Sequence, residues 1–232
     1  MLVAVLALGV IFWIRAVCPA VRPDMEAFRH LKENVEAAVR TRGMAALCLL
    51  GFLTFLCYMG ALGFLSDHLS LPPLSLDERT IGVMVGMSGV AGIVAAPIGG
   101  RLVDGRGRTR TALTGFLTMA LALSLLYLSR EPLQFAVSLL VLGIGTAFIW
   151  TALLTLAVEI VPGLKGTTSS IFNSARFFGY SLAPLLFAPI YSFLGFGTVL
   201  LVGLGLTVSA LLVVGMLAAQ LGPSHSDSTR SS

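Results

Sequence analysis

The sequence predicts an all-α polytopic membrane protein with about seven transmembrane helices. Its 232 residues are 56% hydrophobic and only 11% charged, with a mean hydropathy of +0.94, whereas soluble domains carry about 25% charged residues. The apolar residues gather in runs close to the roughly 20 residues that cross about 30 Å of hydrocarbon. By residue number these runs are 2–17, 44–66, 80–99, 111–129, 133–158, 168–193 and 197–219.

The distribution of basic residues predicts the orientation of the chain. Twelve of the 15 Lys and Arg fall on one side of the predicted helices, Arg176 lies inside a helix, and only Arg79 and Arg130 fall on the other side. Cytoplasmic loops carry an excess of Lys and Arg. We therefore expect a multi-pass protein of the plasma or inner membrane, with the N-terminus outside and the C-terminus cytoplasmic. The basic loops are interpreted as topology determinants, so nucleic acid is not an expected partner.

The first run is interpreted as a retained helix within residues 1–18. A signal peptide places positive charge before its apolar run, but here Met1 leads directly into the run and the charges follow it. Residues 19–42 form the only long cytoplasmic connection. Pro23-Asp24 begins a predicted amphipathic helix there, expected on the membrane surface or against the bundle. Its apolar side consists of Phe28, Leu31, Val35 and Val39.

The loops on the outer side contain signals for helix starts. Pro72-Pro73 precedes Ser75-Leu76-Asp77-Glu78, a capping-box pattern that predicts the start of the helix at residues 80–99. Glu131-Pro132 places a proline in the first turn of the helix at residues 133–158. Small residues along one side of the 80–99 helix predict a close contact with another helix. These residues are Gly82, Gly86 and Gly89, with Gly92, Gly99 and Gly100 further on.

The helix at residues 168–193 carries the unusual polar chemistry. Arg176 lies roughly 12 Å inside it, at 1.5 Å per residue. An intramembrane Arg normally faces the bundle or a wet cavity and is functional; the alternative is that it snorkels to the cytoplasmic interface and anchors the helix. Its candidate cavity or gating residues are Asn173, Arg176, Phe177 and Tyr180.

Two other helices supply candidates for the same cavity. Aromatic and Met side chains can form an adaptable apolar pocket, although ordinary membrane packing is the alternative for each of them. The helix at residues 133–158 contributes Trp150, Thr151 and Thr155, and the helix at residues 44–66 contributes Phe55, Tyr58 and Met59.

Several kinds of chemistry have no support in the sequence. No Asp or Glu lies in the middle of a predicted helix; Asp104 and Glu159 lie at inner ends, so no coupling acid for proton transport is evident. There is no phosphate-binding loop, no Ser, His and acid constellation, and no cysteine spacing suited to a metal. We therefore expect neither an enzyme nor an ATP-driven pump, and no cofactor or metal.

A short cationic loop between the third and fourth runs has the most specific pattern. It spans residues 100–110 with the spacing Gly-x-x-x-Asp-x-x-Gly-Arg. This spacing resembles the signature loop of the major facilitator superfamily of transporters, Gly-x-Leu-Ala-Asp-Arg-x-Gly-Arg-Arg. The matching residues are Gly100, Leu102, Asp104, Gly107 and Arg108, whereas Gly105 and Thr109 replace two basic residues of that pattern.

The resemblance extends over nearly the whole chain. The chain resembles the C-terminal half of a drug-efflux-type member of the superfamily, preceded by the last helix of the N-terminal half. It implies a linker between the halves at residues 19–42, a six-helix unit of two inverted three-helix repeats at residues 43–220, and a disordered cytoplasmic tail at residues 221–232. It also implies that Asp104 and Arg108 latch the outward-open state.

The predicted function is therefore that of a secondary active transporter, an antiporter that exports small amphiphilic molecules by alternating access. The chain is expected to be a fragment, and its partners are the lipid bilayer, a small-molecule substrate and a missing N-terminal half or partner subunit. A seven-helix receptor fits the helix count, but the last helix has no Lys for a retinal Schiff base and no Asn-Pro-x-x-Tyr pattern occurs. A non-transporting membrane scaffold or interaction subunit stays open, because a half-transporter can associate with other chains.

Overall fold

The structure, a computed structural model, describes residues 25–41 and 43–220. The chain divides into two compact units, Met1–Ala37 and Ala38–Ser232, and each is considered by itself. The described residues form helices and short connections, which confirms the all-α class. The predicted helix at residues 2–17 and the tail at residues 221–232 lie outside the described residues, so the count of seven helices stays a prediction.

The predicted helix of the linker is present as α2, Met25–Arg40. Arg40 lies in its last turn, where a positive charge interacts favourably with the helix dipole. Gly43 follows with a φ of 95°, a left-handed value that suits glycine. This turn separates α2 from the next helix.

The apolar runs from residue 44 onward are helical except at Ser129, and most of the helices extend beyond the runs. The last helix, α7, contains non-helical backbone at Gly195, with φ 79° and ψ 175°. A straight helix over the 52-residue candidate span Lys165–Met216 would be about 80 Å long, far more than the roughly 30 Å of a bilayer core. The break at Gly195 therefore divides α7 into the two predicted segments. The bounds are α3 Met44–Ser70, α4 Glu78–Arg106, α5 Arg108–Leu128, α6 Pro132–Glu159 and α7 Lys165–Gln220.

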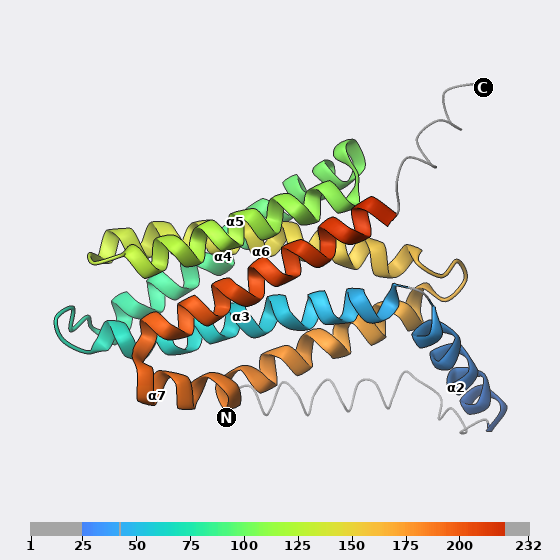
Figure 1. The fold of residues 1–232 in the computed structure, drawn as a ribbon, viewed down its shortest axis with the longest axis horizontal. Coiled ribbons are helices and arrows are strands. Elements are labelled where there is room, and N and C mark those ends of the chain that lie inside the picture. The colour runs from blue at the N-terminus through green and yellow to red at the C-terminus, as the bar shows by residue number, and fades with distance from the viewer. Residues whose placement is uncertain (1–24, 42, 221–232) are drawn as a thin grey trace, which may run out of the picture. The chain divides into compact units, whose positions relative to one another are not determined.

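The first three helices of the bundle, α3 to α5, pack mainly against the later ones, α6 and the two segments of α7. Helix α3 packs chiefly against α7, α4 and α5 pack against α6, and α5 also packs against α7, whereas α3 and α4 barely touch. The helices run side by side along a common direction (Figure 1). Fully buried aromatic side chains from three of them, Phe116, Phe135 and Phe172, fill the core.

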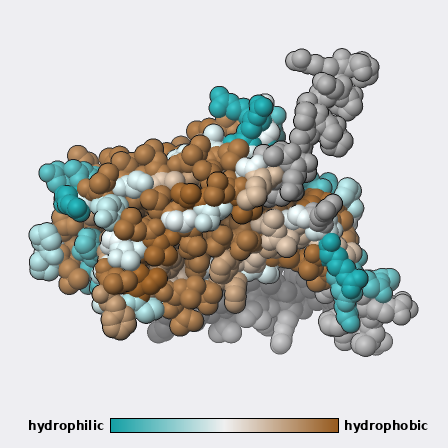
Figure 2. Space-filling model, in the orientation of Figure 1, coloured by the Kyte–Doolittle hydropathy of each residue, from teal (hydrophilic) through white to brown (hydrophobic). Residues whose placement is uncertain are grey.

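The surface of the bundle has the polarity expected of a membrane-embedded protein. Figure 2 shows hydrophobic residues over the middle of the visible face and hydrophilic residues gathered toward the ends. Five helices of the described part of the chain are long and apolar enough to span a membrane. We call the end where α4 meets α5 the basic end, because Arg101, Arg106, Arg108 and Arg110 lie there.

The start of α4 differs in detail from its prediction. The expected capping box from Ser75 to Glu78 is wrong: the N-cap is Asp77. The Thr80 backbone N–H donates to one Asp77 carboxylate oxygen at 3.2 Å and the Thr80 hydroxyl donates to the other at 2.6 Å. These bonds favour the charged carboxylate and lower the pKa of Asp77. The proline start of α6 is confirmed, with Pro132 in the first turn after the N-cap Glu131.

The close helix contact predicted for Gly82, Gly86 and Gly89 is not made within the described bundle. A Cβ added at any of these three glycines would meet no atom within 4 Å. The close approach of α4 to another helix lies on its other side, where a Cβ at Gly143 of α6 would lie 2.0 Å from the carbonyl oxygen of Ser88. The glycine at the closest point is therefore in α6, and Gly92 and Gly99 of α4 also face α6. The side of α4 that carries Gly82, Gly86 and Gly89 is left uncovered by the described helices.

Candidate functional site

Arg176 lies in the first half of α7, surrounded by aromatic rings from three helices. Its Cζ lies 4.1 Å from the ring centre of Trp150 in α6, 4.4 Å from Phe177, 5.2 Å from Phe55 in α3 and 5.8 Å from Tyr180. Arg176 is eleven residues from the start of α7, a depth of roughly 16 Å. We call Phe55, Trp150, Arg176, Phe177 and Tyr180 the Arg176 cluster.

The rings of the cluster also contact one another. Phe55 lies 5.0 Å from Tyr180 and 5.7 Å from Trp150, between ring centres. Phe55 is only 4% exposed, so it forms the buried side of the cluster, against which Trp150 and Tyr180 pack. Phe177, in contrast, is 56% exposed. The cluster is therefore buried on the α3 side and open beside Phe177.

The guanidinium of Arg176 lacks the polar partners that such a group normally has. It makes no hydrogen bond or ion pair with any residue between 43 and 220, and its Nε is buried without a partner. A charge in a transmembrane helix costs about 2.5–3.5 kcal/mol on insertion scales, and each cation–π contact contributes about 0.5–2 kcal/mol. Several ring contacts thus offset the cost of the charge, but they leave the buried Nε–H donor without an acceptor.

Tyr58 extends the cluster toward α4. Its ring centre lies 6.4 Å from that of Phe55, and its hydroxyl lies 3.2 Å from the Ser88 hydroxyl. Ser88 in turn donates to the Val85 carbonyl at 2.8 Å. Six of the candidates from the sequence therefore come together, five of them in the cluster and Tyr58 at its edge.

The remaining four candidates on these helices make other contacts. Thr151 and Thr155 each donate to a carbonyl one turn back on α6, and the Asn173 amide donates to the Ser169 carbonyl at 2.9 Å. Met59 packs in a separate apolar cluster with Phe187 of α7. None of these four makes a polar contact with the guanidinium.

Two residues at the site were not among the candidates. Phe172 stacks on Trp150 with ring centres 5.8 Å apart, and Ser88 pairs with Tyr58. Phe172 precedes Arg176 by four residues, so helical spacing places both on one face. That spacing could have predicted Phe172 from the sequence. Nothing in the sequence around Ser88 distinguishes it from other small residues of α4.

A second polar feature lies at the basic end. Arg108, at the start of α5, forms a two-pronged ion pair with Glu159 at the end of α6: its Nη2 donates to Oε1 at 2.6 Å and its Nε pairs with Oε2. Asp104 is exposed and forms no ion pair within the described ranges. Of the two residues of the implied latch, Arg108 thus pairs with Glu159 of α6 and not with Asp104.

The loop that carries this ion pair has one position that requires glycine. Gly107 separates α4 from α5 with φ 89° and ψ 157°, backbone that other residues adopt only with strain. Gly100 of the same loop belongs to the last turns of α4 and faces open space. No group of three His, Cys, Asp or Glu side chains within residues 25–41 and 43–220 could hold a metal ion.

Comparison with known proteins identifies the family. Residues 44–231 match the sequence profile of the Major Facilitator Superfamily. The chain belongs to this superfamily. No sequence among curated proteins matches it significantly. The superfamily match covers both the Arg176 cluster and the loop of the basic end.

Solved structures with a similar fold include those of a peptide transporter, POT. The chain resembles a POT mutant in complex with sulfate (TM-score 0.70, 21% identity), the mutant in complex with alafosfalin (0.69, 20%) and POT in complex with sulfate (0.70, 21%). These matches cover 76%, 80% and 76% of this chain but only 37%, 41% and 37% of those chains. At this identity the likeness shows the major facilitator fold alone, and this chain spans about two fifths of the structures it matches.

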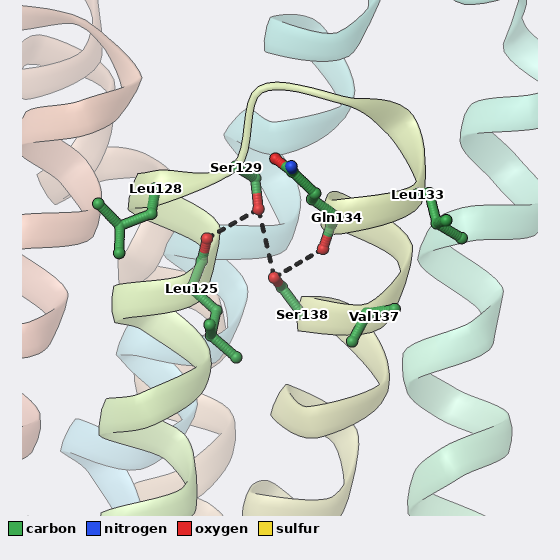
Figure 3. Close-up of a pocket in the computed structure, with 7 residues that line it drawn as sticks. All are labelled: Leu125, Leu128, Ser129, Leu133, Gln134, Val137 and Ser138. Carbon is green, nitrogen blue, oxygen red and sulfur yellow. Dashed lines mark hydrogen bonds between the residues drawn. The ribbon is translucent and has the colours of Figure 1, made fainter.

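This major facilitator bundle also has an open pocket between α5 and α6 at the end opposite the basic end. It has a volume of about 390 Å³ and is lined by Leu125, Leu128, Ser129, Leu133, Gln134, Val137 and Ser138 (Figure 3). Its hydroxyls are already paired: Ser129 donates to the Leu125 carbonyl and Ser138 to the Gln134 carbonyl, both at 2.7 Å. The pocket shares no residue with the Arg176 cluster, and both of its serine hydroxyls already donate to carbonyls. We therefore do not assign this pocket to the substrate.

Proposed function

We propose that this chain is part of a secondary active transporter that exports small amphiphilic molecules by alternating access. Membership of the major facilitator superfamily supports transport as the general activity. The chain spans about two fifths of the transporters it resembles, which is consistent with a six-helix half that works with a second half. Export, antiport and the cytoplasmic position of the basic end are parts of the proposal.

The observation that carries the proposal is the Arg176 cluster. Intramembrane cations are costly, and they normally face a bundle interior or a wet cavity where they take part in function. Here the cation is surrounded by Trp150, Phe55 and Tyr180 from three helices. A charged group beside apolar rings suits a ligand with a polar head and an apolar body.

The basic end supplies the proposed conformational latch. The loop of Gly100, Asp104, Gly107 and Arg108 is joined to the end of α6 by the pair of Arg108 with Glu159. The side chains of this pair are 45% and 42% exposed, and exposed ion pairs contribute about 0–1 kcal/mol. Such a contact is weak enough to break in each transport cycle, and Asp104 is left free to contact a second half.

Efflux from cells that produce the transporter to which this chain is proposed to belong tests this function. Extrusion of a fluorescent amphiphile is compared for the wild type, Arg176→Ala and Arg176→Lys at equal amounts in the membrane. We expect Arg176→Ala to impair efflux more than Arg176→Lys, because Lys retains the charge but not the planar group that stacks on rings. Equal, wild-type efflux from both variants would mean that Arg176 only anchors the helix. A correctly inserted chain without any efflux would favour the non-transporting subunit.

A further inference from the structure

We propose that the Arg176 cluster binds organic anions, a carboxylate or sulfonate attached to an apolar body. The guanidinium of Arg176 holds the anionic group, and the rings of Phe55, Trp150 and Tyr180 hold the apolar body. This inference rests on the proposed function and narrows its substrate class from amphiphilic molecules in general to anionic ones.

Arg176 has no counterion among the described residues of the bundle. The acids of the bundle lie near the helix ends, and the two that face other helices are engaged: Glu159 with Arg108 and Asp67 with the hydroxyl of Tyr191. Arg176 has no acidic partner within residues 43–220. The positive charge of the cluster is therefore uncompensated by the bundle that holds it.

Arg176 also has an N–H donor without an acceptor. A guanidinium presents five N–H donors in a planar fork, and ring faces attract its charge without supplying oxygen acceptors. The Nε of Arg176 is buried and has no hydrogen-bond partner. An oxyanion supplies both the opposite charge and the two acceptors that match this fork.

The rings around Arg176 provide a place for the apolar body of the ligand. Three rings, Phe55, Trp150 and Tyr180, lie within 5.8 Å of the Arg176 Cζ, so a ligand whose head meets the guanidinium places its body among them. Phe177 is 56% exposed, which leaves the cluster open on that side. A cationic amphiphile of the same shape is repelled by Arg176. The expected order of affinity is anion, then neutral molecule, then cation.

Three probes with the same body test this order. Cyclohexylacetate is anionic at pH 7, 2-cyclohexylethanol is neutral, and 2-cyclohexylethylamine is cationic. The chain has two tryptophans, Trp13 and Trp150, so a Trp13→Phe background makes Trp150 the reporter. Each probe is titrated against Trp150 fluorescence with the full chain in lipid nanodiscs. We expect saturable binding of cyclohexylacetate, weaker by roughly tenfold or more for the alcohol and absent for the amine.

Variants assign the preference to Arg176. Arg176→Gln is expected to weaken cyclohexylacetate binding by roughly tenfold or more and to leave the alcohol within twofold, whereas Arg176→Lys gives an intermediate loss. The matched control Arg130→Gln removes an exposed cation outside the cluster and should change nothing. Equal affinity of the wild type for the anion and the alcohol would overturn the proposal, and this comparison needs no variant to fold.

Binding and efflux, measured together, separate this inference from the proposed function. Selective anion binding without efflux would support the anion site and count against transport. Efflux of neutral or cationic amphiphiles by a protein that does not bind cyclohexylacetate would support transport and count against the anion site.

Discussion

Arg176 illustrates what the structure adds at the scale of single residues. The sequence left two interpretations open, a functional cation or a side chain that snorkels to the interface. The guanidinium lies among Trp150, Phe177 and Phe55, so neighbouring helices determine its position. That arrangement supports the functional interpretation, which the efflux and binding experiments test.

The ion pair of Arg108 with Glu159 gives a prediction at the same scale. Glu159→Arg places two like charges together, so we expect opening of the basic end and reduced efflux with normal membrane insertion. The double variant Arg108→Glu with Glu159→Arg restores opposite charges and should recover most of the activity. Because the pair is exposed, the change in unfolding free energy of Glu159→Gln should stay within about 1 kcal/mol. The latch is contradicted if the double variant is as inactive as the single one.

At the scale of elements, the contact between α4 and α6 depends on one glycine. A Cβ at Gly143 would lie 2.0 Å from the backbone oxygen of Ser88, and backbone cannot move aside as a side chain can. We expect Gly143→Ala to lower the unfolding free energy by about 1–3 kcal/mol, the usual cost of overpacking. Thermal unfolding in detergent measures the effect.

Gly82→Ala is the matched control for this contact. It makes the same change in α4, where the new Cβ meets no atom within 4 Å of the described bundle. We expect no loss of thermal stability, because alanine favours helix more than glycine does. A loss as large as that of Gly143→Ala would show that another surface covers this side of α4.

The break within α7 gives a second prediction for an element. Gly195 has φ 79° and ψ 175°, and a Cβ there would meet no atom within 4 Å. The cost of Gly195→Ala is therefore backbone strain alone, about 1–3 kcal/mol. Gly205→Ala, in helical backbone with equally open surroundings, should not destabilise the protein. Equal melting temperatures of the two variants would contradict this account of the break.

These elements also show which features the sequence could predict. Long apolar runs predicted the helices, and the gap between residues 193 and 197 marked the break in α7, because hydropathy is a property of the segment itself. The helix partners depend on other segments: Gly82 and Gly143 look alike in sequence, yet only Gly143 meets a neighbouring backbone. In the same way, Asp104 and Glu159 were both available to Arg108, and only the fold decided between them.

At the scale of the whole molecule, the bundle leaves faces that its own helices do not cover. The glycine side of α4 is open, and exposed aromatic side chains such as Phe177 and Phe178 lie on α7. Lipid can cover apolar faces, but the Arg176 cluster opens beside Phe177, where a wet path is needed for a charged group. The proposed second half would complete such a path if it packed beside Phe177.

The orientation of the whole chain can be tested by labelling single cysteines. In a background with Cys18, Cys48 and Cys57 replaced by Ala, a cysteine is placed at Gly105, at the basic end, or at Leu71, at the opposite end; both positions are exposed. Because basic loops stay in the cytoplasm, we expect a membrane-impermeant maleimide to label Leu71→Cys in intact cells and Gly105→Cys only after permeabilisation. The reverse pattern would place the basic end outside. It would also place the Arg108–Glu159 pair on the outer side, so the proposed latch would close the outer path instead of the cytoplasmic one.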